Sequence, residues 1–126
     1  MSLLKVLKLW ITVVILWINA LTNCGQIEAD NLFRLTAYCG CEECCGEWSD
    51  GRFANNDKCH TGACACNWLN FGTKVYIDGK IYIVKDRGAK KYFGSRQHPI
   101  KAIDIYYENH KEAKRYGVKW KEVVIL

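Results

Sequence analysis

Two aspartates occupy positions where a carboxyl group can do acid–base chemistry. Asp86 directly follows a run rich in β-branched residues, and Asp104 lies between Ile103 and Ile105. Because side chains alternate along a strand, Asp104 is expected to point away from these two isoleucines. A carboxyl group that is partly buried in a cleft has a raised pKa and can serve as a general acid. The alternative is that Asp86 pairs with Arg87 or caps a turn, while Asp104 is a solvated surface residue.

The cysteines offer a second kind of chemistry. All but one of the eight fall within residues 39–66, and these are Cys39, Cys41, Cys44, Cys45, Cys59, Cys64 and Cys66. In an oxidising compartment a small domain uses cysteines as disulfide cross-links, so we expect disulfides, with a connectivity that the spacing does not fix.

Two other uses of the thiols are weaker alternatives. Together with His60 they are numerous enough for a zinc site, but their spacings match no standard zinc finger, so we expect no metal and no other cofactor. A cysteine nucleophile paired with His60 or His98 has no recognisable motif around it. His110 is expected to lie on the surface of a helix.

The N-terminus indicates export. Two lysines precede an apolar run over residues 9–18, which is shorter than the roughly 20 residues that span a bilayer and is typical of a signal peptide. We therefore expect a signal peptide over residues 1–29, cleaved after Ala20 or Ala29, with an uncleaved anchor as the alternative. The net charge of +5 is mild and shows no clustered basic face, which argues against nucleic acid as a partner.

Most of the elements that must position these residues are expected to be strands. The alternation of apolar and polar residues predicts strands over residues 32–38, 73–77, 80–84, 102–107 and 119–126. Asp78-Gly79 is the sequence of a two-residue type I′ hairpin turn between the second and third of these.

One helix and one long loop complete the expected elements. Asn109 and Gly117 have the residue types of a helix N-cap and C-terminal glycine, and they frame a helix of about two turns. Residues 40–67 are expected to form a loop held by disulfides. Short strands with one short helix predict a small β-barrel, forming a single domain over residues 31–126.

Several sequence motifs, taken in order, also resemble a known family. They cover residues 33–46, 71–77, 84–88, 103–106 and 109–118. This set resembles the three-aspartate (3D) domain of secreted and phage-encoded bacterial proteins, and it spans nearly the whole predicted mature chain. The resemblance implies a mostly β, disulfide-stabilised, six-stranded double-psi β-barrel with one short helix, related to membrane-bound lytic transglycosylase A and rare lipoprotein A.

The resemblance also implies a function. It describes a secreted, cell-wall-associated monomer that cleaves peptidoglycan glycan strands at the β-1,4 bond between N-acetylmuramic acid and N-acetylglucosamine. The expected reaction is that of a lytic transglycosylase, with a glycan hydrolase that uses Asp86 to direct a water as the other enzymatic alternative. No membrane partner is expected beyond export or an N-terminal anchor. The family's catalytic aspartate matches Asp104, and Asp86 matches its supporting middle aspartate. Arg87, Tyr38 and Asn67 are the residues expected to bind substrate.

The chain departs from the family pattern at one aspartate and in one loop. The first family aspartate is absent, and Asn67 stands in its region, while the loop over residues 89–101 is longer than usual. A non-catalytic module of the same fold that binds or loosens the wall is therefore the alternative function. A disulfide-stabilised secreted protein with another role is the third.

Overall fold

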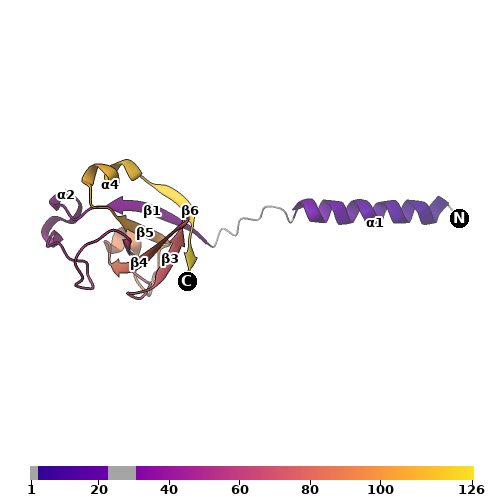
Figure 1. Ribbon diagram of the computed structural model, residues 1–126. Helices are drawn as coiled ribbons and strands as arrows, with labels where there is room; N and C mark the ends of the chain where they lie inside the picture. Colours follow the sequence, from indigo (N-terminus) through magenta and orange to yellow (C-terminus); the bar gives the residue numbers. More distant parts are fainter. Residues whose placement is uncertain (1–2, 23–30) are drawn as a thin grey trace.

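The computed structural model describes residues 3–22 and 31–126 (Figure 1). Helix α1 covers Leu3–Thr22, and all the strands lie in the second range. No helix in the described ranges combines the length and the apolar character that crossing a bilayer requires. The cleavage point predicted after Ala29, like Cys24, falls outside the described residues.

The strands with strong local signals form where the sequence predicts them. β1 covers Leu32–Tyr38 and β5 covers Ala102–Tyr106, while β3 (Lys74–Ile77) and β4 (Lys80–Asp86) pair as an antiparallel hairpin. The turn residues between β3 and β4 have φ angles of 53° at Asp78 and 81° at Gly79. Two successive positive φ angles define the type I′ turn, so this prediction is confirmed.

The predicted helix is also present. α4 covers His110–Tyr116, and the Oδ1 of Asn109 accepts hydrogen bonds from the backbone N–H groups of Lys111 and Glu112. Gly117 ends the helix with a φ of 67°, a conformation that glycine adopts at little cost. The N-cap and C-terminal glycine predicted from the sequence are therefore confirmed.

The predicted closed six-stranded barrel is wrong. The chain forms a seven-stranded mixed sheet in the order β6-β1-β5-β2-β4-β3-β7. The C-terminal stretch, predicted as one strand, divides into β6 (Lys119–Glu122) beside β1 and β7 (Val124–Ile125) beside β3. The division falls at Val123, whose side chain is buried in the core and whose N–H binds the carbonyl of Asn31. In the described ranges no ladder joins β6 to β7, so the sheet is not closed.

The seventh strand and three further helices were not predicted. β2 (Ala63–Ala65) lies in the predicted loop, yet it runs parallel to β4 and antiparallel to β5 in the middle of the sheet. The additional short helices are α2 (Glu42–Cys45), the 3-10 turn η2 (Gly46–Trp48) and α3 (Lys90–Phe93). The expectation of a single short helix is therefore wrong as well.

The sheet packs around an aliphatic core. Its fully buried side chains include those of Leu35, Val75, Ile77, Val84, Ile103 and Ile105. Cys64 and Cys66 are buried in the same cluster. All seven cysteines in the described residues have free thiols, so the prediction of disulfide stabilisation is wrong for this part of the chain. Burial, at about 1.5–3 kcal/mol for each large aliphatic side chain, stabilises the domain instead.

Candidate functional site

The strand register gathers the two predicted catalytic aspartates on one face of the sheet. Asp104 on β5 pairs with Thr36 on β1 and with Ala65 on β2, and Ala65 pairs in turn with Asp86 on β4. Residues that are directly opposite one another on neighbouring strands point to the same face. We call Thr36, Asp104, Ala65 and Asp86 the aspartate row. At about 4.8 Å between strands, the backbones of the two aspartates are about 10 Å apart, with only the small Ala65 between them.

Asp104 is partly buried and carries a raised pKa. Its Oδ1 accepts a hydrogen bond of 2.9 Å from the hydroxyl of Thr36. Burial raises the pKa of the Asp104 carboxyl to about 6; the hydrogen bond from Thr36 opposes this shift and the nearby charge of Asp86 adds to it. A carboxyl group with such a pKa exchanges its proton readily in mildly acidic solution, as a general acid must.

Asp86 differs because protein donors occupy both of its oxygens. Its Oδ2 accepts a hydrogen bond of 2.6 Å from the Tyr38 hydroxyl. Its Oδ1 accepts hydrogen bonds of 2.9 Å from the backbone N–H groups of Ala54 and Arg87. Burial, followed by the charge of Asp86, raises the pKa of Tyr38, so the tyrosine stays a hydroxyl donor over the whole physiological range.

Two of the residues predicted to bind substrate have side chains that hydrogen-bond to backbone groups of neighbouring loops. The guanidinium of Arg87 donates to the carbonyls of Cys66 and Leu69 and lies 3.9 Å from the ring centre of Phe71. The Asn67 amide donates to the carbonyls of Gly88 and Gly94 and accepts from the Gly88 N–H, at 2.8–2.9 Å.

The structure therefore gathers the side chains of three of the five predicted site residues, namely Asp104, Asp86 and Tyr38. Arg87 reaches Asp86 only through its backbone N–H. Thr36 and Ala54 were not predicted. The parallel pairing of β1 with β5 would have placed Thr36 beside Asp104. The residues Asn55-Asn56-Asp57 are typical of a turn, but nothing in the sequence shows that this turn presents the Ala54 N–H to Asp86.

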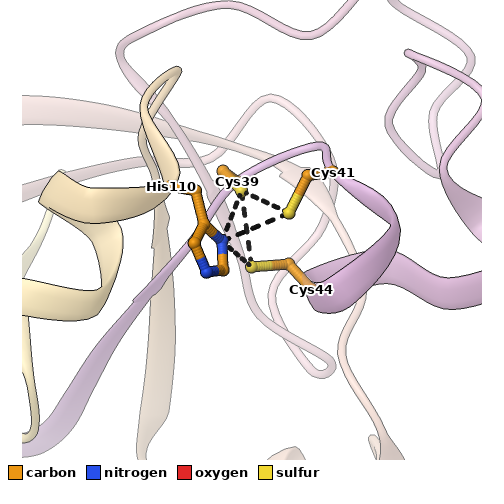
Figure 2. Close-up of side chains that lie close together, drawn as sticks. All are labelled: Cys39, Cys41, Cys44 and His110. Atoms are coloured by element: carbon orange, nitrogen blue, oxygen red, sulfur yellow. Dashed lines mark hydrogen bonds between the residues drawn. The ribbon is translucent and has the colours of Figure 1, made fainter.

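A second cluster of functional groups lies at the end of β1 and was not predicted. The Sγ atoms of Cys39, Cys41 and Cys44 and the Nδ1 of His110 converge on one point, all within 4.8 Å of one another (Figure 2). The Sγ of Cys39 lies 3.0 Å from that of Cys41 and 3.4 Å from that of Cys44. The Nδ1 of His110 lies 3.3, 3.2 and 3.5 Å from the Sγ atoms of Cys39, Cys41 and Cys44. We call these four residues the thiol–imidazole cluster.

Sheet topology explains how residues so distant in sequence meet. β1 and β5 are parallel, and Tyr38 pairs with Tyr106, so both strands end at the same edge of the sheet. Cys39 follows β1 immediately, and His110 begins α4 a few residues after β5. Cys41 and Cys44 lie at the two sides of the α2 turn, where the Cys44 N–H donates to the Cys41 carbonyl at 3.1 Å. His110, predicted as a surface residue of a helix, lies on α4 and is half-buried as a member of this cluster.

A carboxylate and two backbone groups lie close to the cluster. An Oε2 of Glu43 lies 2.9 Å from the Nε2 of His110, on the side of the ring away from the thiols. The pKa of the Cys41 thiol is lowered to about 7, first by the hydrogen bond from the Cys39 thiol and then by backbone hydrogen bonds from Cys44 and Glu43. The cluster thus favours a thiolate at Cys41.

The described residues also form two open hollows, of about 400 and 520 Å³. The first is lined by Phe33, Trp68 and residues 123–125 among others, and the second by residues 94–95 and 98–100 with Lys90. Neither includes a member of the aspartate row or of the thiol–imidazole cluster.

No family model and no curated protein matches this sequence. The chemistry of the two sites therefore carries the functional interpretation, together with the motif resemblance described above.

Proposed function

We propose that the chain is an exported enzyme that cleaves peptidoglycan glycan strands, a lytic transglycosylase in which Asp104 is the general acid. The observation that carries the proposal is the partly buried Asp104 carboxyl, whose pKa is raised to about 6, in register with a second carboxyl group across Ala65. The motifs that resemble the three-aspartate domain support the same substrate class.

In the proposed reaction one carboxyl group acts twice. Asp104 donates its proton to the β-1,4 glycosidic oxygen, and the bond from that oxygen to C1 of the muramoyl residue breaks. The C6 hydroxyl of the same residue then attacks C1 and gives its proton to the Asp104 carboxylate. The products are a free 4-hydroxyl on N-acetylglucosamine and a 1,6-anhydromuramoyl end, with no net consumption of water.

Asp86 and Tyr38 have supporting roles in this scheme. The negative charge of Asp86 stabilises the oxocarbenium-like transition state, and the hydrogen bonds from Tyr38, Ala54 and Arg87 fix its carboxylate in place. The contacts of Arg87 and Asn67 with backbone carbonyls make them positioning residues for the loops beside the row.

Two observations favour a second candidate, a non-catalytic module that binds the wall. Asp86 is already bound by three donors of the protein itself, and Asn67, which stands in the region of the missing first aspartate, is bound to Gly88 and Gly94. Both features are also expected of a site whose polar side chains stabilise the folded structure and take no part in catalysis.

Muropeptide analysis separates the two candidates. Purified peptidoglycan is incubated with the full chain and with D104N, and the soluble products are identified by mass spectrometry. The matched control is D78N, which removes an exposed carboxylate at the hairpin turn and keeps a residue type suited to that turn. We expect anhydromuramoyl products from the wild type and D78N and none from D104N. Sedimentation with the wall without any products would support the binding module.

The pH dependence of the reaction gives an independent test of the acid. Because Asp104 must carry its proton to act, the rate should fall as the pH rises above about 6. A rate that stays constant from pH 5 to pH 8 would show that Asp104 is not the general acid.

A further inference from the structure

We infer that Cys39, Cys41, Cys44 and His110 bind one zinc ion, which joins the cysteine-rich segment over residues 40–62 to the sheet. The inference does not depend on the proposed glycan-cleaving activity. It assigns a new metal site to thiols that the sequence analysis expected to form disulfides.

The distances between the four donor atoms suit a shared ion better than a covalent bond. A disulfide places its two sulfurs about 2.05 Å apart, whereas the Sγ atom of Cys39 is 3.0 and 3.4 Å from its two neighbours. Zinc bonds of about 2.3 Å to sulfur and 2.0 Å to nitrogen, arranged as a tetrahedron, put sulfurs about 3.7 Å apart and sulfur about 3.5 Å from nitrogen. The imidazole-to-thiol distances of 3.2–3.5 Å approach these values for all three cysteines at once.

A disulfide could join only two of these thiols and would not explain why the imidazole lies close to all three. In the cluster, Nδ1 of His110 faces all three sulfurs together (Figure 2). Three soft thiolates and one imidazole are a donor set of structural zinc sites. All four atoms surround one point, which suits a single ion better than a two-iron cluster with separate ligands for each iron.

A carboxylate outside the four ligands lies close to the second ring nitrogen of His110. A histidine that binds a metal through one ring nitrogen usually donates the N–H of the other to a carboxylate. Here Oε2 of Glu43 lies 2.9 Å from Nε2 of His110.

The site would be structural and not catalytic. Three cysteines and one histidine fill the four positions of a tetrahedral zinc ion, which leaves none for water or substrate. On binding, the three thiols release their protons to solvent, so the ion and its ligands together carry one negative charge if His110 is neutral. Zinc would also protect these thiols from oxidation after export.

Zinc content is the first measurement. The full chain is produced with zinc in the medium, passed over a desalting column and analysed by native mass spectrometry and elemental analysis. We expect one zinc ion per chain, and replacement by cobalt should give the intense thiolate-to-cobalt absorption of a tetrahedral site. Iron in place of zinc, or a protein that contains no metal and has a disulfide between two of these cysteines, would overturn the inference.

Matched variants assign the ligands. C44S should lose the zinc, whereas C45S should keep it, because the adjacent Cys45 Sγ contacts the carbonyl of Cys39 and lies outside the cluster. E43Q should keep one zinc per chain but bind it about 10–100-fold more weakly, whereas E42Q, on the same short helix, should bind it as the wild type does. Equal zinc retention by C44S and C45S would show that the cluster is not the site.

Discussion

Replacing Asp104 by asparagine tests the central electrostatic claim without any substrate. The variant keeps the size of the side chain and an oxygen that can accept the Thr36 hydrogen bond, but it removes the ionisable group. The folded protein raises the pKa of this carboxyl from 3.8 to about 6, chiefly by burial. The folded state therefore binds this proton more tightly than the unfolded state does.

The sign of the effect follows from linkage. Well below pH 3.8 the carboxyl is protonated in both states and has no linked effect on stability. As the pH rises towards 6, the unfolded state releases the proton first, and the wild-type free energy of unfolding falls. A shift of about two pKa units corresponds to about 3 kcal/mol, which is the loss expected above pH 7.

Urea denaturation measures this directly. At pH 8 we expect D104N to be more stable than the wild type by up to about 3 kcal/mol, and at pH 4 we expect most of this difference to have disappeared. D78N serves as the control and should show no comparable gain at either pH. If D104N is no more stable than the wild type at pH 8, the argument that burial destabilises the Asp104 carboxylate is refuted.

Two further predictions concern the contacts that hold the row and its loops. Y38F removes the hydroxyl that donates to Asp86 and should lower the free energy of unfolding by about 1–3 kcal/mol, measured by thermal or urea denaturation; an unchanged stability would contradict the importance of this bond. G94A should be strongly destabilising, because φ is 70° there and an added Cβ would lie 2.3 Å from the carbonyl oxygen of His98. G79A, with a φ of 81° and open space around the Cβ position, should cost only about 1 kcal/mol in the same assay, and equal losses would refute the steric argument.

The elements that the sequence predicts are those with strong local signals. The turn at Asp78-Gly79 depends on the backbone conformation of two adjacent residues, and the Asn109 cap depends on hydrogen bonds to residues two and three positions later. Local sequence is therefore enough to specify both. β2 has no such signal: its sequence is Ala-Cys-Ala, and it becomes a strand because β4 and β5 hydrogen-bond to it on both sides. The division at Val123 likewise depends on which strands lie beside the C-terminal stretch.

The same distinction applies to the two candidate sites. The alternation around Ile103 and Ile105 was enough to place Asp104 off the core, but its distance from Asp86 in space depends on the register through Ala65. The Cys41-x-x-Cys44 spacing is one that structural zinc sites use. The imidazole, however, comes from a histidine 66 residues beyond Cys44, and no spacing rule could place it there. The expectation of export also favoured disulfides over a metal for these cysteines.

The two sites share β1, yet they depend on the cysteine-rich segment to different degrees. The contact of Asp104 with Thr36 lies wholly within the sheet, between β5 and β1. Asp86, by contrast, takes one of its three hydrogen bonds from the Ala54 N–H, which belongs to the cysteine-rich segment. Cys39 also follows directly after Tyr38, whose hydroxyl supplies another. Release of the proposed zinc ion should therefore weaken the hydrogen bonds that Ala54 and Tyr38 donate to Asp86. The hydrogen bond between Thr36 and Asp104 should remain largely intact, so zinc loss is expected to affect Asp86 more than Asp104.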